Sequence, residues 1–174
     1  MKPLFLIGYM GCGKSTLGRK LARRLGVSFA DTDALIEQQE GASVADIFQY
    51  EGEQHFREVE RAVLEQLLAT RDEVVISTGG GLPTWDDNMV RMNAIGYTVY
   101  LRRTAEQIAH RLTPYGRQKR PRLRGLSDEE LLAFMTKDMA MRETFYEQAT
   151  TTFICDEESD ERLVERILEC IKKN

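Results

Sequence analysis

PLFLIGYMGCGKST, residues 3–16, indicates the class of fold from the start of the chain. Its first five residues are apolar and predict a strand, and residues 14–25 have the pattern of a helix. Between them lies G-x-x-x-x-G-K-[ST], whose glycines let backbone N–H groups point inward at a polyphosphate. We expect Lys14 to reach the β- and γ-phosphates of a nucleotide and Ser15 to ligate Mg²⁺. The strand–loop–helix context favours a nucleotide-phosphate site over a plain glycine-rich turn.

The composition is that of a soluble globular protein and predicts one domain over residues 1–174. Hydrophobic residues make up 42% of the chain and charged residues 30%. The net charge of −4 argues against nucleic acid as a dedicated partner. The sequence has no signal-peptide pattern and no segment long enough to span a membrane. We therefore expect a cytoplasmic protein, and we expect it to be a monomer.

Short apolar runs alternate with helical patterns along the chain. This alternation predicts an α/β fold of three layers, α/β/α, around a central five-stranded parallel sheet. The expected strands are residues 3–7, 27–30, 73–77, 97–101 and 152–155, and the expected helices are 14–25, 33–40, 43–50, 53–69, 86–93, 104–112, 127–149 and 159–172. Ligands of such sheets bind outside the carboxyl ends of the strands, so the residues that follow each strand are the candidates for chemistry.

Two carboxylates follow the second expected strand, Asp31 and Asp33. In an extended chain, residues i and i+2 point to the same side. One carboxylate could hold Mg²⁺ through water, and the other could orient or deprotonate an acceptor hydroxyl. Alternatively, one of them caps the helix that begins near Ala34, and Asp33 is the candidate for that role.

Three glycines, Gly79, Gly80 and Gly81, follow the third expected strand. They leave the backbone uncovered, so a ligand could approach it closely. Ser77 or Thr78 occupies the place where many P-loop enzymes have a Walker-B aspartate, so Mg²⁺ would depend on Ser15 and Asp31.

Two arginines lie on helical faces that otherwise carry apolar residues. Arg57 precedes Glu60 by three residues, a spacing that suits an ion pair, and Arg142 lies within the stripe of the helix at 127–149. A buried guanidinium needs an anion, which could be a protein carboxylate such as Asp138 or a ligand. Together the two arginines suggest a clamp for a carboxylate, with the glycine triplet as its floor.

A basic segment rich in proline and glycine spans residues 112–126, and we call it the lid. We expect it to lie outside the core and to close over the transferring phosphoryl group, although basic loops are often merely solvated. Arg120, held before Pro121, is its leading candidate for phosphate contact. Cys12 stands at a helix N-terminus, where a thiol can be reactive, but a small residue tolerated in the loop is the simpler interpretation.

These motifs, in this order, resemble those of the shikimate kinase family, a P-loop kinase family similar to the nucleoside monophosphate kinases. The resemblance covers most of the chain. It depends on Gly8–Thr16, Asp31-Thr32-Asp33, Phe56-Arg57-x-x-Glu60, Ser77-Thr78-Gly79-Gly80-Gly81, Arg120-Pro121 and Arg142-x-x-x-Tyr146. The phosphate loop alone is common to many families, whereas the ordered combination is far more specific.

The resemblance implies transfer of the γ-phosphoryl group of ATP, with Mg²⁺, to the 3-hydroxyl of shikimate in aromatic amino-acid biosynthesis. It also implies a role for each matching residue. The implied catalytic residues are Lys14, Asp33 and Arg120. The implied ATP-binding residues are Gly11, Cys12, Gly13, Lys14, Ser15, Thr16, Arg111 and Arg120. The implied shikimate-binding residues are Asp33, Arg57, Gly79, Gly80, Gly81 and Arg142, in a helical region at about 33–61, and Glu60 would orient Arg57. The implied metal ligands are Ser15 and, through water, Asp31.

Two features depart from the family pattern. The loop at 156–160 is acidic and lacks the proline often found near the adenine, so we make no prediction of its nucleotide contacts. Arg122 and Arg124 follow Arg120, so the arginine that reaches the phosphate is also open. The alternatives are a P-loop kinase for another small hydroxy acid, such as gluconate, and a nucleotide-binding regulator without catalysis.

Overall fold

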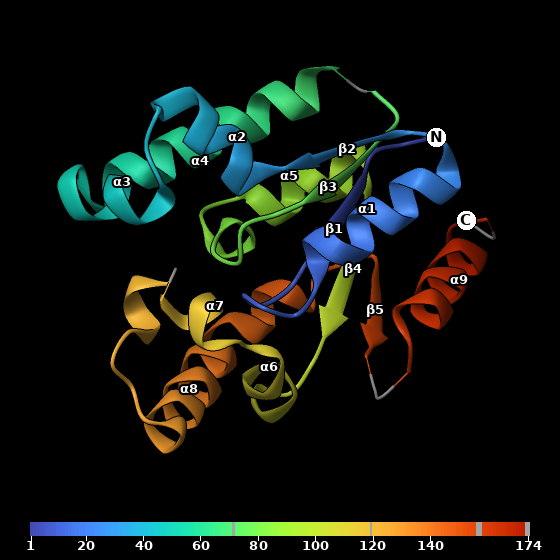
Figure 1. The fold of residues 1–174 in the computed structure, drawn as a ribbon. Helices are drawn as coiled ribbons and strands as arrows, with labels where there is room; N and C mark the ends of the chain where they lie inside the picture. The colour runs from blue at the N-terminus through green and yellow to red at the C-terminus, as the bar shows by residue number, and fades with distance from the viewer. Residues whose placement is uncertain (71, 119, 156–157, 173–174) are drawn as a thin grey trace.

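A five-stranded parallel sheet forms the middle of the molecule, with strand order β2-β3-β1-β4-β5 (Figure 1). The structure is a computed structural model, and it describes residues 1–70, 72–118, 120–155 and 158–172. The strands are β1 (Leu4–Ile7), β2 (Ser28–Asp31), β3 (Val74–Ser77), β4 (Tyr97–Arg102) and β5 (Thr151–Ile154). β1 lies at the centre, and all four of its residues are buried, as expected for a parallel strand that is covered on both faces.

Helices cover both faces of the sheet, which confirms the predicted α/β/α layers (Figure 1). The α-helices are α1 (Lys14–Leu25), α2 (Thr32–Glu40), α3 (Val44–Tyr50), α4 (Gly52–Thr70), α5 (Asn88–Ile95), α6 (Ala105–Arg111), α7 (Pro114–Gln118), α8 (Asp128–Tyr146) and α9 (Asp160–Ile171). Two 3₁₀ turns, η1 (Leu82–Thr84) and η2 (Pro121–Leu123), complete the elements. Among the described residues, no helix is both long enough and apolar enough to cross a bilayer.

The apolar side chains form two clusters. The larger one lies around the sheet and includes Leu6, Ile76 and Leu101. The smaller cluster holds α2, α3 and α4 together through Ile36, Ile47, Phe56, Val59 and Val63. α4 thereby presents Arg57 and Glu60 at a fixed place beside the sheet.

Most predicted boundaries differ from the structure by one to three residues, and two of the differences affect the site. β2 extends to Asp31, and α2 begins at Thr32, so Asp31 and Asp33 are not successive residues of one extended segment. The lid contains α7 and η2, where we expected only a loop. Leu123 in the lid is 1% exposed and belongs to the larger core cluster, so the expectation that this segment stays outside the core is wrong.

Candidate active site

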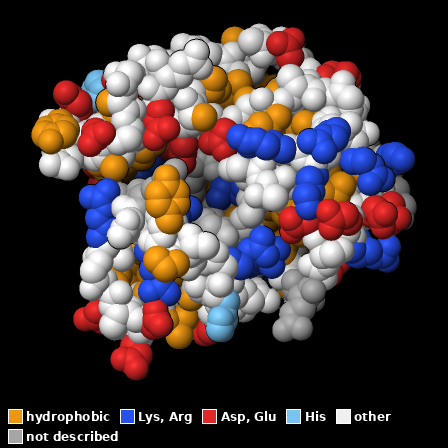
Figure 2. Space-filling view, in the orientation of Figure 1, with side chains coloured by type: hydrophobic (Ala, Val, Ile, Leu, Met, Phe, Trp, Pro, Cys, Tyr) orange, Lys and Arg blue, Asp and Glu red, His pale blue; other side chains and the backbone are white. Residues whose placement is uncertain are grey.

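The carboxyl ends of β1, β2 and β3 open into a cleft of about 420 Å³. Most of the sequence-predicted phosphate and metal residues line it, among them Gly11, Gly13, Lys14, Ser15, Thr16, Asp31, Asp33, Gly80, Arg111 and Arg120. In the space-filling view, Lys and Arg side chains lie in and beside the hollow that separates the α2–α3 region from the lid (Figure 2). The cleft therefore concentrates positive charge at the place where the sheet topology predicts a ligand.

The phosphate loop winds around the side chain of Lys14. Gly11 and Gly13 have φ angles of 78° and 105°, which residues with a Cβ rarely adopt. Lys14 is 8% exposed, and its ammonium group donates to the carbonyl oxygens of Gly8 and Tyr9, at 2.8 and 2.9 Å. Cys12 is fully buried, which agrees with its simpler interpretation as a small loop residue.

Arg103, which the sequence analysis did not single out, anchors this loop from behind. It is 7% exposed, and its Nε donates to the carbonyl oxygen of Cys12 at 2.9 Å. Its Nη1 donates to the carbonyl oxygen of Cys155, just after β5, at 3.1 Å. The available signal was an arginine immediately after a buried strand, but nothing in the sequence indicated that its partners are backbone carbonyls.

Three side-chain oxygens meet beside the start of α1. The hydroxyl of Ser15 donates to Oδ2 of Asp31 at 2.6 Å, and it lies 3.2 Å from the hydroxyl of Ser77. Ser77 ends β3, at the position that a Walker-B aspartate often occupies, so this position contributes a hydroxyl rather than a charge. Hard oxygen donors of this kind suit Mg²⁺.

Asp31 caps α2, whereas we expected Asp33 to be the capping candidate. The Asp31 Oδ1 accepts from the backbone N–H of Asp33 at 3.1 Å. Because the N-cap precedes the helix, Asp33 falls in the first turn and is free to face the cleft. Both carboxylates line the cleft, as predicted, although the local backbone differs from the predicted one.

Two carboxyl groups in the site have raised pKa values. Burial and the neighbouring Asp31 raise the pKa of Asp33 to about 6, although Lys14 and Arg57 act in the opposite direction. Burial also raises the pKa of Glu60 to about 7, although its ion pair with Arg57 lowers it. Perturbed carboxyl groups of this kind gather at functional sites.

Arg57 is buried on α4 and paired as predicted. Its Nη1 donates to Oε2 of Glu60 at 2.5 Å, and Glu60 is 1% exposed. Aromatic rings surround the guanidinium, with its Cζ 5.3 Å from the ring centre of Phe56 and 6.0 Å from that of Trp85. Trp85 was not predicted, because its contact with Arg57 joins segments far apart in the sequence.

The glycines at 79–81, which we call the glycine floor, lie against the predicted acceptor residues. A Cβ on Gly79 would lie 2.5 Å from Oδ1 of Asp33, and a Cβ on Gly81 would lie 2.5 Å from Nη1 of Arg57. A Cβ on Gly80 would lie 3.7 Å from Nη1 of Arg142. The floor therefore brings Asp33, Arg57 and Arg142 around one short stretch of bare backbone.

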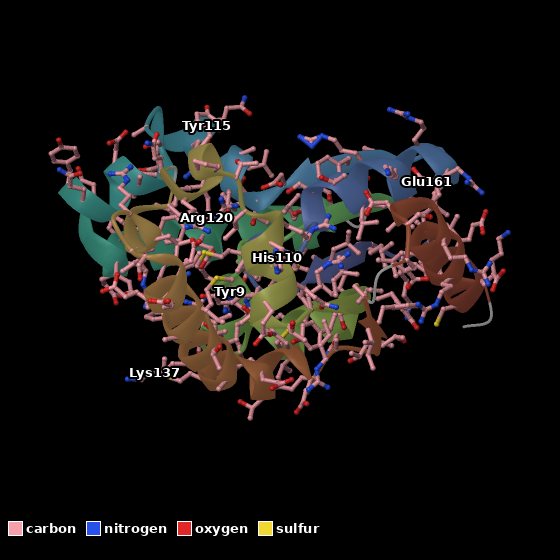
Figure 3. The ribbon with its side chains drawn as sticks, turned by 60° about the horizontal axis from the view of Figure 1, so that its bottom comes forward. Tyr9, His110, Tyr115, Arg120, Lys137 and Glu161 are labelled. Atoms are coloured by element: carbon pink, nitrogen blue, oxygen red, sulfur yellow. The ribbon has the colours of Figure 1, made fainter. Side chains whose placement is uncertain are left out.

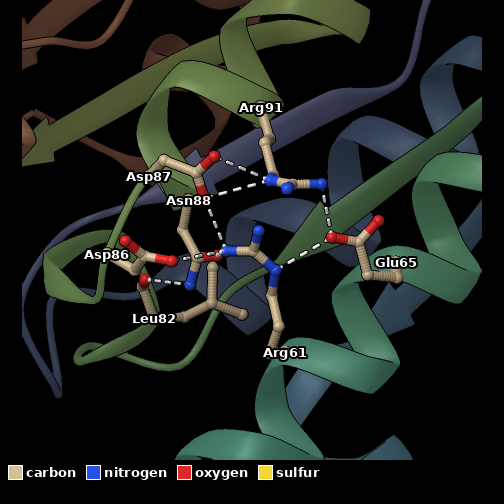
Figure 4. Close-up of polar contacts among 7 residues, drawn as sticks. All are labelled: Arg61, Glu65, Leu82, Asp86, Asp87, Asn88 and Arg91. Carbon is tan, nitrogen blue, oxygen red and sulfur yellow. Dashed lines mark hydrogen bonds and ion pairs between the residues drawn. The ribbon is translucent and has the colours of Figure 1, made fainter.

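A polar network joins α4 to the segment that follows the glycine floor (Figure 4). Arg61 donates through Nη1 to Oδ1 of Asn88 at 2.5 Å, and Nδ2 of Asn88 donates to the carbonyl oxygen of Leu82 at 2.9 Å. Glu65 and Asp87 both pair with Arg61 and Arg91. The helix that carries Arg57 is thus held against the floor.

Arg142 on α8 faces both a protein carboxylate and the glycine floor. Its Nη2 lies 3.1 Å from Oδ2 of Asp138, so the ion pair considered in the sequence analysis is present. Its Cζ lies 5.4 Å from the centre of the Tyr9 ring. The hydroxyl of Tyr146 donates to the carbonyl oxygen of Gly80 at 2.6 Å, which holds α8 against the floor.

The lid arginines divide between the cleft and other partners. Arg120 lines the cleft, and its Nη1 donates to the carbonyl oxygen of Gly116 at 2.5 Å. Arg122 instead pairs with Asp138, and Arg124 donates to the carbonyl oxygen of Gln118. Arg111 at the end of α6 also lines the cleft. In the acidic loop at 156–160, residues 156 and 157 lie outside the described residues.

Comparison with known proteins identifies shikimate kinases as similar in both sequence and fold. The shikimate kinase family model matches residues 10–172. A shikimate kinase of Parabacteroides distasonis is 47% identical over 153 residues, which cover 88% of this chain and 87% of the relative. The crystal structure of shikimate kinase from Bacteroides thetaiotaomicron has a TM-score of 0.91 at 40% identity, covering 98% of each chain. Shikimate kinase from Acinetobacter baumannii in complex with shikimate has a TM-score of 0.89 at 35% identity, covering 100% of this chain and 94% of that one.

Proposed function

The chain belongs to the shikimate kinase family, and from this premise we propose how its cleft transfers the γ-phosphoryl group of ATP to the 3-hydroxyl of shikimate. The hydroxyl oxygen attacks the γ-phosphorus, the bond between that phosphorus and the leaving oxygen of ADP breaks, and the hydroxyl proton passes to Asp33. The products are shikimate 3-phosphate and ADP.

The position of Asp33 is the observation that carries this proposal. Its carboxylate lines the cleft together with Lys14 and Ser15, and it also abuts Gly79 in the glycine floor. It is therefore the group common to the phosphate half and the acceptor half of the site. Its pKa of about 6 leaves it largely ionised near neutral pH and still basic enough to accept a proton.

The phosphate half consists of the loop at Gly8–Thr16, Arg111 and Arg120. Lys14 and Arg120 neutralise charge that develops on the transferring phosphoryl group, and Gly11, Cys12, Gly13 and Thr16 supply backbone donors at the start of α1. Arg111 lies at the cleft wall beside Gly13 and stacks on the adenine. Arg103 keeps the loop in place.

The residues beside Ser15 fit a divalent ion that is bound mainly by nucleotide phosphates and water. Ser15, and through water Asp31, would hold Mg²⁺, and Ser77 is close enough to support this set. Such an ion supplies Lewis-acid stabilisation of phosphate charge. The described residues contain no cluster of three or more His, Cys, Asp or Glu side chains suited to a metal.

The acceptor half binds shikimate between α4, α8 and the glycine floor. Arg57 and Arg142 hold the carboxylate of shikimate, and Glu60 fixes the orientation of Arg57. Gly79, Gly80 and Gly81 allow the ring of the acceptor to approach the backbone. Asp33 also contacts the shikimate hydroxyls.

Coupled measurement of ADP release tests the reaction. With MgATP, ADP formation should depend on shikimate, and D-gluconate should support little or no turnover. Faster turnover of gluconate would favour the other hydroxy-acid kinase, and ATP binding without turnover of any acceptor would favour a regulator. Neither alternative is favoured by the family to which the chain belongs.

The remaining proposals concern the whole protein. Residues 1–174 act as one P-loop kinase domain, with an acceptor-binding region at about 33–61 and a lid at about 112–126. We propose a cytoplasmic monomer. The exposed large apolar side chains come from separate elements, which supports a monomer. Light scattering of the purified protein measures the mass directly, and 19.9 kDa is expected.

A further inference from the structure

One buried carboxylate, that of Asp138, joins three segments of the site. Asp138 is 4% exposed on α8, whereas the neighbouring Lys137 points outward (Figure 3). Its Oδ2 accepts from the hydroxyl of Tyr9 at 2.7 Å and lies 3.1 Å from Nη2 of Arg142. Its Oδ1 lies 3.3 Å from the same Nη2 and 3.5 Å from Nη2 of Arg122 in the lid. A buried aspartate with this many donors has no freedom to turn.

Tyr9 completes the arrangement from the side of the phosphate loop. It is 1% exposed, and its ring lies beneath the Arg142 guanidinium at 5.4 Å. Burial and the Asp138 carboxylate raise the pKa of Tyr9, so its hydroxyl stays protonated and donates. Arg142 is thus held by the Asp138 carboxylate at Nη2 and by the face of the Tyr9 ring, and it also lies beside the side chain of Tyr146. The carboxylate and the ring together fix the position and the plane of the guanidinium.

The other nitrogen of Arg142 faces the place where an acceptor would lie. Nη2 is engaged by Asp138, whereas Nη1 lies 3.7 Å from where a Cβ on Gly80 would stand. Arg122 and Arg142 each carry one positive charge, and Asp138 carries one negative charge, so this group of three has a net charge of +1. That remaining charge suits a ligand with a single carboxylate.

We propose that Asp138 and Tyr9 are positioning residues for the acceptor, which hold Arg142 so that its Nη1 edge faces the glycine floor and receives the carboxylate. The inference rests on the proposed role of Arg142 in shikimate binding. Neither Asp138 nor Tyr9 is among the predicted shikimate-binding residues, and the proposal gives each of them an effect on acceptor affinity without contact with the acceptor.

The sign of the effect separates positioning from simple charge competition. If Asp138 only competed with the ligand carboxylate for Arg142, its removal would tighten acceptor binding. If it positions Arg142, its removal weakens binding, because the guanidinium is released from its orientation. In Asp138→Asn the amide oxygen can still accept from Tyr9, but the amide N–H₂ then faces the donors of Arg142.

Steady-state kinetics and shikimate titration test the proposal, with Trp85, the single tryptophan, as a fluorescent probe beside Arg57. We expect Asp138→Asn to raise the KM and Kd for shikimate about tenfold, and Tyr9→Phe to raise them about threefold. The KM for ATP should change less than about twofold in both variants. An unchanged or lowered Kd for shikimate in both variants would overturn the proposal.

Two comparisons show whether the effect passes through Arg142. In an Arg142→Met background, Asp138→Asn should change the Kd no further, and with shikimate methyl ester the wild type and Asp138→Asn should bind alike. If Asp138→Asn still raises the Kd tenfold in the Arg142→Met background or with the methyl ester, the effect is a general structural one. Tyr9→Phe removes a single hydroxyl and tests the same positioning if Asp138→Asn fails to fold.

Asp128→Asn is the matched control. Asp128 is also on α8 and also pairs with a lid arginine, because Nη1 of Arg117 lies 2.6 Å from its Oδ1, but it is largely exposed and away from Arg142. We expect its kinetics to match the wild type. If Arg142→Met leaves the Kd for shikimate unchanged, the proposed function is wrong about the acceptor site; if only Asp138→Asn and Tyr9→Phe have no effect, only the present inference is wrong.

Discussion

Asp33 has the most direct chemical role of any single residue in the proposed reaction. Its carboxyl group must be ionised to accept the hydroxyl proton, and its pKa is about 6. We therefore expect kcat/KM for shikimate to fall as the pH decreases through about 6, because protonation of the unliganded protein removes the base. Asp33→Asn should lower kcat by roughly two to four orders of magnitude and abolish this acidic limb of kcat/KM. Initial rates over a pH series, at limiting and at saturating shikimate, measure both effects.

If Asp33→Asn lowers kcat by less than this, Asp33 has a different role. Kinases of this type transfer phosphoryl groups mainly by positioning and electrostatic stabilisation. If Asp33→Asn loses less than about tenfold in kcat and keeps the acidic limb, Asp33 orients the hydroxyl and another group takes the proton. Glu60, with a pKa of about 7, would then be the next group to examine.

Gly81 lies directly against the guanidinium of Arg57. A Cβ there would lie 2.5 Å from both terminal nitrogens of Arg57, and Gly81 has an ordinary φ of −87°, so an alanine adds a clash without backbone strain. We expect Gly81→Ala to raise the KM for shikimate about tenfold or more, with the KM for ATP nearly unchanged. Gly80→Ala is the matched variant, because its Cβ would meet its nearest neighbour at 3.3 Å, and its effect should be smaller. If Gly81→Ala raised the KM values for shikimate and for ATP equally, Gly81 would not belong to the acceptor pocket alone.

The chemistry-bearing residues at strand ends were predictable, but the residues that support them were not. Lys14, Asp31 and Asp33 follow strands, and parallel topology brings such positions to one edge. Arg103 and Trp85 act through contacts with segments far away in sequence. A single sequence contains no information on such pairs, because each arginine has several equally suitable carboxylates or carbonyls.

At the scale of elements, the lid provides the clearest contrast. Arg120 lines the cleft, whereas Arg124, four residues later, is exposed and donates to the lid backbone. We expect Arg120→Ala to reduce kcat about 10²- to 10³-fold, because it removes a positive charge directed at the phosphoryl group. Arg124→Ala should stay within about threefold of the wild type. Comparable losses in both variants would show that the lid acts through its total charge rather than through one arginine.

The five strands and the longer helices were predictable from periodicity, and the elements that were misplaced have identifiable reasons. Asp31 both ends β2 and caps α2, so one residue serves two elements and shifts the boundary. In the lid, proline and glycine indicated a loop, and Leu123 alone did not reveal that the lid inserts a side chain into the core. Short helices such as α7 produce too few turns for a periodic signal.

At the scale of the whole molecule, the raised pKa of Glu60 links the site to stability. Its ordinary pKa is 4.5, and in the fold it is about 7, so between these values the native protein binds more protons than the unfolded chain. The contribution of this group to the free energy of unfolding is therefore full below about 4.5 and is lost as the pH rises through about 7. In Glu60→Gln this titration is absent.

Denaturant unfolding across a pH series tests this link. The free energy of unfolding of the wild type, relative to that of Glu60→Gln, should decrease as the pH rises from about 5 to about 8. A difference that stays flat over this range would mean that the ion pair with Arg57 outweighs burial and that the pKa of Glu60 does not lie above its ordinary value. The variant should also bind shikimate more weakly, because Arg57 loses its partner.

The contacts of Arg103 have a consequence for the order in which the protein can be assembled during synthesis. The phosphate loop is complete in sequence after sixteen residues. Its anchor, however, reaches from Cys12 to the carbonyl of Cys155, which follows the last strand. A nascent chain therefore contains every phosphate-binding residue of the loop long before the loop is fastened. The anchor of the loop is therefore complete only after β5 has joined the sheet.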